Sequence, residues 1–126
     1  MHGTVTARAA TDRGARYAKQ LASHLGRKIS TAVDDAGVAT IRLEDATAVL
    51  TPAPPALEMT FSGPTDDNLG RLVAVVASHF ERFAAKDGVV VEWDDDVVAA
   101  EYTERKAVMD AQRAERKAAE VRAARE

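Results

Sequence analysis

Two serine–histidine pairs are the residues of this sequence whose types best suit chemistry. Ser23 and His24 form the first pair, and Ser78 and His79 form the second. A histidine can bind a metal through a neutral ring nitrogen, or transfer a proton near neutral pH. His24 and His79 are therefore candidate metal ligands or acid–base groups.

The two pairs belong to an internal repeat with a displacement of fifty-five positions. Polar residues recur at this displacement: Asp12 as Asp67, Arg16 as Arg71, Ser23 as Ser78, His24 as His79, and Arg27 as Arg82. Apolar residues follow the same shift: Tyr17 to Leu72, Leu21 to Val76, and Leu25 to Phe80. Because residues at these spacings share one face of a helix, the repeat predicts two amphipathic helices with equivalent faces.

The candidate ligand-binding residues surround the two histidines. They are Ser23, His24, Arg27, Ser78, His79, Arg82 and Tyr17. If the two helices pack side by side, the imidazoles would face a common space and bind iron, zinc or haem. No catalytic residue is assigned, since no nucleophile or oxyanion donor accompanies the histidines.

A structural explanation competes with this hypothesis. Each histidine lies near the end of a predicted helix, where its protonated form interacts favourably with the helix dipole. Each preceding serine can bond a carbonyl group one turn back. Two histidines without thiolates or a spaced carboxylate are also a small ligand set.

A local cluster of basic residues is the second chemical feature. It comprises Arg8, Arg13, Arg16, Lys19, Arg27 and Lys28. Such a cluster can receive an anionic ligand such as a phosphate or a carboxylate, or it can be a solvated helix face.

The elements that carry these residues follow from the hydrophobic pattern. Alternation of apolar residues predicts six strands, at 4–10, 29–33, 38–43, 47–51, 57–61 and 89–93. Helices are predicted from Asp12 to Leu25 and from Asp66 to about Lys86. Prolines at 52, 54 and 55 are expected to end the fourth strand.

The resulting order, β-α-β-β-β-β-α-β, predicts an α+β fold. We expect a two-layer sandwich in which both helices cover one face of a mixed β-sheet, with an internal pseudo-duplication. The α+β domain would span residues 1–96. Residues 97–126 are rich in Ala, Arg, Lys and Glu, and we expect a charged helical tail there.

Composition narrows the function classes. The chain has 126 residues and no cysteine, which excludes disulfides and thiolate metal sites. The net charge of −3 gives no field that would attract nucleic acid. No signal peptide or membrane-spanning segment is evident, so we expect a cytoplasmic protein. Its partners would be a second copy, or a protein bound through Val97–Glu126.

Several motifs resemble a known family. They are Arg16-Tyr17, Lys19-Gln20-Leu21, Ser23-His24, the run from Ala77 to Phe83, and Val91-Glu92-Trp93. Over residues 6–94 the chain resembles the bacterial domain of unknown function 2218. Ala18, Ala22, the proline-rich segment 51–55 and the tail depart from its pattern.

The resemblance implies an uncharacterised protein with no established activity. It also gives a contextual hint, because members of the family occur with iron-uptake and siderophore functions. We therefore expect a small binding or accessory module that is iron-linked, through a metal, haem or a siderophore-related ligand, at its two Ser-His pairs. The alternative is a structural or protein-interaction module that uses the C-terminal helix and binds no small ligand. A small acid–base enzyme that uses His24 or His79 is a third and less favoured alternative.

Overall fold

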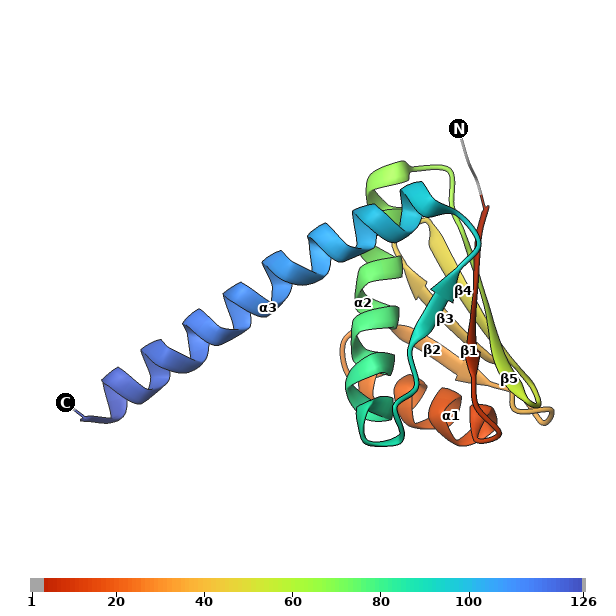
Figure 1. Cartoon of the computed structure of the whole chain (residues 1–126), viewed down its shortest axis with the longest axis horizontal. Coiled ribbons are helices and arrows are strands. Elements are labelled where there is room, and N and C mark those ends of the chain that lie inside the picture. Colours follow the sequence, from red (N-terminus) through yellow and green to blue (C-terminus); the bar gives the residue numbers. More distant parts are fainter. Residues whose placement is uncertain (1–3, 126) are drawn as a thin grey trace.

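The structure is a computed structural model that describes residues 4–125 (Figure 1). In chain order its elements are β1 (Thr4–Ala10), α1 (Gly14–Leu25), β2 (Ser30–Val33), β3 (Ala39–Leu43), β4 (Ala46–Ala53), β5 (Ala56–Ser62), α2 (Asp66–Ala84), the short 3-10 helix η1 (Ala85–Asp87), β6 (Val91–Trp93) and α3 (Asp96–Arg125). The predicted α+β class and the predicted order of elements are confirmed.

The six strands form one sheet in the order β2-β3-β4-β5-β1-β6. Each of its five pairings is antiparallel, so the prediction of a mixed sheet is wrong in this respect. The crossovers through α1 and α2 do join strands that run in the same direction. In both cases other strands lie between the two ends of the crossover, so no parallel strands become neighbours.

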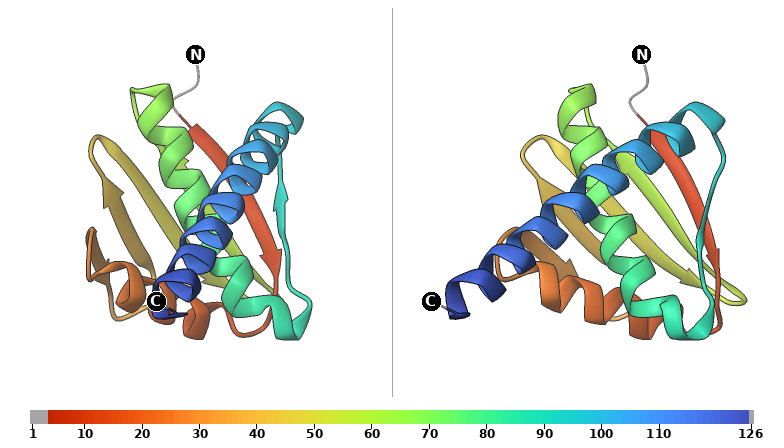
Figure 2. Two further views of the ribbon diagram at one scale, coloured as in Figure 1. Left: turned by 90° about the vertical axis from the view of Figure 1, so that its left-hand side faces the viewer. Right: turned by 60° about the vertical axis from the view of Figure 1, so that its left-hand side comes forward.

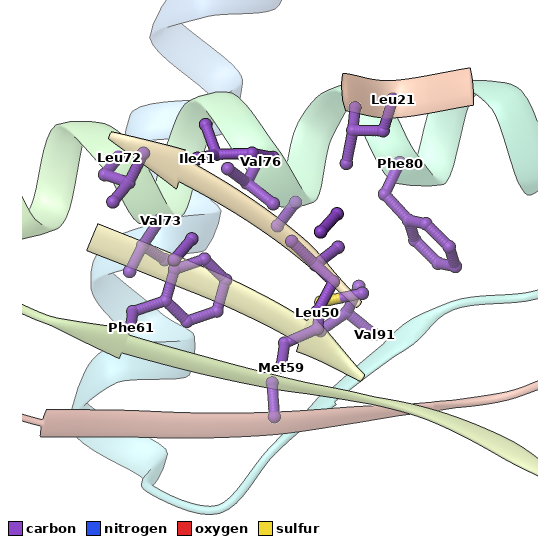
Figure 3. Close-up of a cluster of buried hydrophobic side chains, with 14 of the residues drawn as sticks. Leu21, Ile41, Leu50, Met59, Phe61, Leu72, Val73, Val76, Phe80 and Val91 are labelled. Carbon is purple, nitrogen blue, oxygen red and sulfur yellow. The ribbon is translucent and has the colours of Figure 1, made fainter. Parts of the chain in front are cut away.

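Helices α1 and α2 cover the same face of the sheet, as predicted (Figure 1). The alternation of β5 directs Leu57, Met59 and Phe61 towards these helices, and all three side chains are buried. Leu72, Val76 and Phe80 of α2 and Leu21 of α1 are buried in the same hydrophobic cluster (Figure 3). This cluster is the hydrophobic core, and it holds both helices on the sheet.

Strand β4 continues past the position at which the prolines were expected to end it. Pro52 lies opposite Leu57 of β5, and Ala53 lies opposite Ala56. On its other side β4 is paired with β3 only as far as Leu50. Residues 51–53 therefore face a partner on one side only, where a proline without an N–H group is tolerated.

Helix α3 packs on α2 by its first half and then leaves the body (Figure 2). Tyr102 is buried and Met109 is partly buried, whereas every residue from Asp110 to Arg125 is exposed. Within residues 4–125, no helix has both the length and the apolar composition needed to cross a membrane.

The carboxylate of Glu81 in α2 links this helix to the N-terminal half of α3 and to β6. It accepts hydrogen bonds from the Tyr102 hydroxyl at 2.6 Å, the Lys106 ammonium at 3.1 Å and the Val91 backbone N–H at 3.1 Å. Burial alone would raise the pKa of Glu81, but these hydrogen bonds outweigh it and lower the pKa below its ordinary value. The half-buried Glu81 is therefore ionised where α2, β6 and α3 meet.

Candidate metal-binding site

Packing of α1 against α2 brings the two predicted histidines together. His24 lies in the last turn of α1, and His79 lies in the second half of α2. Their ring centroids are 5.3 Å apart, and the ring planes are inclined by 43°. The side chains of the internal repeat thus meet at one place on the helical layer.

His79 is held in a single tautomer when it is neutral. Its Nδ1 atom lies 2.7 Å from the backbone oxygen of Val75, one turn earlier in α2. Because a carbonyl oxygen can only accept, Nδ1 carries the proton of this hydrogen bond. The other ring nitrogen, Nε2, then has a free lone pair, which is the state that binds a metal.

The surroundings of His79 also favour the neutral ring. Burial lowers the pKa of His79 below its ordinary value, and interaction with the nearby Arg82, His24 and Arg113 side chains lowers it further, although the hydrogen bond to Val75 opposes the shift. At neutral pH the His79 imidazole is therefore mainly uncharged.

His24 is the exposed member of the pair. Its ring meets the ring of Phe83 edge-on, with centroids 5.5 Å apart and an interplanar angle of 88°. Phe83 follows His79 by one turn of α2, so the same helix face contacts His24 twice. A bound group would reach the pair from the solvent side of α1.

The two serines, although equivalent in sequence, have different environments. Ser78 is buried, and its hydroxyl donates to the oxygen of Val75 at 3.4 Å, as the structural explanation of the Ser-His motif predicts. Ser23 is exposed and lines a groove beside α1. Only Ser23 is accessible to a ligand.

The remaining predicted site residues lie around the histidines and not between them. Arg27 is exposed just beyond the end of α1. Arg82 is exposed on α2, where its charge interacts with Arg113 and Asp110 of α3. Tyr17 is buried and donates its hydroxyl to Asp87, and its ring meets Phe80 edge-on at 5.5 Å. Tyr17 is thus mainly a core residue with one polar edge.

Two side chains at this site, His24 and His79, are of a type that can bind a metal. Within residues 4–125, no cluster of three or more histidine, cysteine, aspartate or glutamate side chains is arranged to hold a metal ion. A metal bound by His24 and His79 would therefore complete its coordination with water or with atoms of another molecule.

Sequence reasoning missed two neighbours of the histidines. The carbonyl group of Val75 orients His79, and Phe83 packs against His24. Both lie four residues from His79, on the same helix face, so the helical period was the signal that would have identified them.

Comparison with known proteins agrees with this architecture. The family described as an uncharacterized protein conserved in bacteria (DUF2218) matches residues 6–94. The chain is similar to the NMR structure of PA4090 from Pseudomonas aeruginosa, with 26% sequence identity and a TM-score of 0.62. That similarity covers 74% of this chain and 96% of the other. No curated protein matches the chain.

Proposed function

Because this chain belongs to the DUF2218 family of uncharacterized bacterial proteins, we propose its function from the site itself: it is a binding module that holds a divalent transition-metal ion between His24 and His79. The observation that carries this proposal is the 5.3 Å separation of the two imidazole rings. The metal would be iron or zinc, both of which accept imidazole ligands.

The separation of the rings fits a shared metal. A metal–nitrogen bond of about 2.0–2.1 Å puts each ring centre about 3.2 Å from the metal, and a tetrahedral angle then puts the two centres about 5.2 Å apart. The His24 and His79 centroids are 5.3 Å apart before any metal is bound. Little movement of the helices is therefore needed to bind the ion.

The same distance favours a metal ion over haem. Two imidazoles that bind haem iron from opposite faces have ring centres about 6.4 Å apart, by the same bond lengths, with the porphyrin plane between them. His24 and His79 are closer than this, at 5.3 Å, and they belong to helices in direct contact. Haem binding would require α1 and α2 to separate.

The number of protein ligands supports an accessory role in place of catalysis. Two imidazoles leave two positions of a tetrahedral ion open, for water or for a chelating molecule that arrives with the metal. The described partners of the two rings are Phe83 and the Val75 carbonyl group, and neither is a nucleophile or a general base. The module would receive and release a metal without transforming a substrate.

A titration of the purified chain tests the proposal. Zn(II), anaerobic Fe(II) and haem are added separately, and the melting temperature is followed, because a ligand that binds only the native state must raise it. Co(II) absorption in the same protein reports directly on nitrogen coordination. We expect a saturable response to the metal ions that is lost in the variant His24→Ala/His79→Ala.

Two further variants make the result specific. His24→Ala alone removes an exposed side chain, so it should abolish binding without unfolding the protein. His2→Ala is the matched control, since His2 is the third histidine of the sequence and belongs to neither Ser-His pair. Unchanged metal affinity in the double variant, or equal loss in the His2 control, would remove the proposal. A response to haem and to neither metal ion would mean that the ligand is haem and not a metal ion.

A protein-interaction module that uses α3 is the second candidate. It is supported by the exposure of every residue from Asp110 to Arg125, a helical segment that contributes nothing to the core. Deleting residues 111–126 retains Tyr102, Lys106 and Met109 and so should leave the fold intact. If α3 mediates self-association, this deletion lowers the mass measured by light scattering; an unchanged mass argues against a homodimer formed through α3.

A further inference from the structure

A groove beside α1 carries a strong local positive charge. It has a volume of about 510 Å³ and runs between α1 and the end of α2, together with η1, which follows α2 directly. Its lining residues are Arg13, Arg16, Tyr17, Lys19, Gln20, Ser23, Phe83 and Lys86. A volume of this order is typical of small-molecule sites.

Among the groove cations that the structure describes, Arg13 is the one in a close ion pair, although the Asp87 carboxylate also interacts electrostatically with Arg16 and Lys86. Arg13 pairs with Asp87 at 3.6 Å. None of the ion pairs formed within residues 4–125 includes Arg16, Lys19 or Lys86. The groove thus has a net charge of +3, from four cations and Asp87, in a chain whose net charge is −3.

The structure splits the basic cluster that the sequence indicated. Arg13, Arg16 and Lys19 share the groove, whereas Arg8, Arg27 and Lys28 do not line it. Lys86, which is sixty-seven positions after Lys19, lines the groove from the side opposite α1. Because cations from two separate segments converge on one hollow, a solvated helix face is no longer a sufficient explanation.

Aromatic residues give the groove an apolar wall. Phe83 is partly buried, and its ring also contacts the edge of His24. Tyr17 contributes ring surface, while its hydroxyl is bound to Asp87. A ligand that fits this surface has negative groups for the cations and a compact apolar or planar part for Phe83.

We infer that the groove between α1 and η1 is a binding site for a small multivalent organic anion, held by Arg16, Lys19 and Lys86 through its carboxylate or phosphate groups. The inference goes beyond the proposed metal site, because it uses different side chains and requires no metal. Four cations in a groove of this size suit a small molecule and are too few for a nucleic-acid surface.

Calorimetric titration of the metal-free full chain at low ionic strength tests the inference. The probes are citrate, inorganic pyrophosphate and benzene-1,2-dicarboxylate, which separate a tricarboxylate, a phosphate and an aromatic dicarboxylate. We expect saturable binding of at least one probe. The preferred probe identifies the anionic group, and absence of saturable binding by all three overturns the inference.

Substitutions of exposed residues locate the site. Arg16→Gln/Lys19→Gln should weaken binding by about tenfold or more, since losing one charge-assisted hydrogen bond already has an effect of that order. Arg116→Gln/Lys117→Gln is the matched control, with the same charge change on the exposed part of α3. Equal weakening in both variants would show a general charge effect and refute a site in the groove.

Two more variants distinguish this site from its neighbours. Phe83→Ala should weaken the aromatic dicarboxylate more than pyrophosphate, because only the former uses the apolar wall. His24→Ala/His79→Ala retains all four cations of the groove, so it should bind pyrophosphate as the unsubstituted chain does, whereas the aromatic dicarboxylate also depends on Phe83, which packs on His24. If that variant loses anion binding while the groove variants keep it, the anion is bound at the histidines and the inference is wrong.

Discussion

Replacement of Glu81 by alanine tests how α3 is held on the body. In the variant two donors lose their acceptor: the Tyr102 hydroxyl, which lies 2.6 Å from the Glu81 carboxylate, and the Val91 N–H, which lies 3.1 Å from it. A buried donor left without a partner costs about 1–3 kcal/mol. Lys106 can turn to solvent, so its ion pair contributes about 0–1 kcal/mol.

These terms add up to about 2–7 kcal/mol in the free energy of unfolding for Glu81→Ala. Because the Glu81 site is only half-buried, water can reach part of it, and we expect a loss in the lower part of this range, about 2–4 kcal/mol. This is a large part of the about 5–15 kcal/mol that stabilises a typical domain. Glu81→Gln should cost less, about 1–2 kcal/mol, because the amide oxygen can still accept from one of the two donors. Glu115→Ala, on the exposed part of α3, is the matched control and should stay within about 0.5 kcal/mol of the unsubstituted chain.

Urea denaturation followed by tryptophan fluorescence measures the effect. Trp93 is the one tryptophan of the chain, and its ring centroid is 5.2 Å from that of Tyr102, so its emission reports on the docking of α3. The emission of folded Glu81→Ala should also change if α3 detaches. A loss below about 0.5 kcal/mol, with native emission unchanged, would refute the role assigned to Glu81.

Three further perturbations have expected outcomes. Metal affinity should fall as pH decreases through the lowered pKa of His79, because protonation of Nε2 competes with the metal. Affinity that stays constant over the whole acid range in which the chain remains folded would contradict ligation by this ring. The same shift also makes the stability of the metal-free chain depend on pH, because the pKa of His79 is lower in the folded than in the unfolded state. The contribution of His79 to the free energy of unfolding is present above the unfolded pKa of about 6.5 and decreases as pH falls. Thermal melting of the chain and of His79→Gln between pH 8 and 5.5 measures this contribution. Tyr17→Phe should lower the free energy of unfolding by about 0.5–1.5 kcal/mol in urea denaturation, because Asp87 loses the hydroxyl donor but remains near solvent and Arg13. A loss above about 3 kcal/mol would mean that the hydroxyl has another role. Gly70→Ala should raise the free energy of unfolding by about 0.5 kcal/mol, because alanine is a better helix former than glycine in α2. The added carbon would lie 3.1 Å from the Arg105 guanidinium, which has to move slightly. A decrease in the melting temperature would show that Arg105 cannot move.

Glu81 also makes the attachment of α3 dependent on pH. Its pKa is lower in the folded state than in the unfolded state, so its contribution is fully present above the unfolded value, near pH 4.5, and is lost as pH falls through the folded value. Because Glu81 lies two residues from His79 on α2, acid weakens the docking of α3 on the helix that carries the proposed metal site.

The sequence alone predicted most of the local structure, because strand and helix periods are properties of neighbouring residues. The alternation of Leu57, Met59 and Phe61 identified β5, and the repeat placed His24 and His79 at equivalent positions of two helices. It did not predict strand neighbours, since those depend on where a crossover ends on the sheet. The continuation of β4 through Pro52 likewise depended on the end of its pairing with β3 at Leu50.

Tertiary structure decided whether the candidate residues form a site. The helical period fixes the face on which each histidine lies, but the crossing of α1 over α2 fixes their separation, and that crossing is set by the shared core beneath them. The convergence of Lys86 with Arg16 and Lys19, and of Tyr102 with Glu81, joins segments distant in the chain. Such contacts arise from the packing of whole elements, so the sequence determined which side chains were available and the fold determined which of them meet.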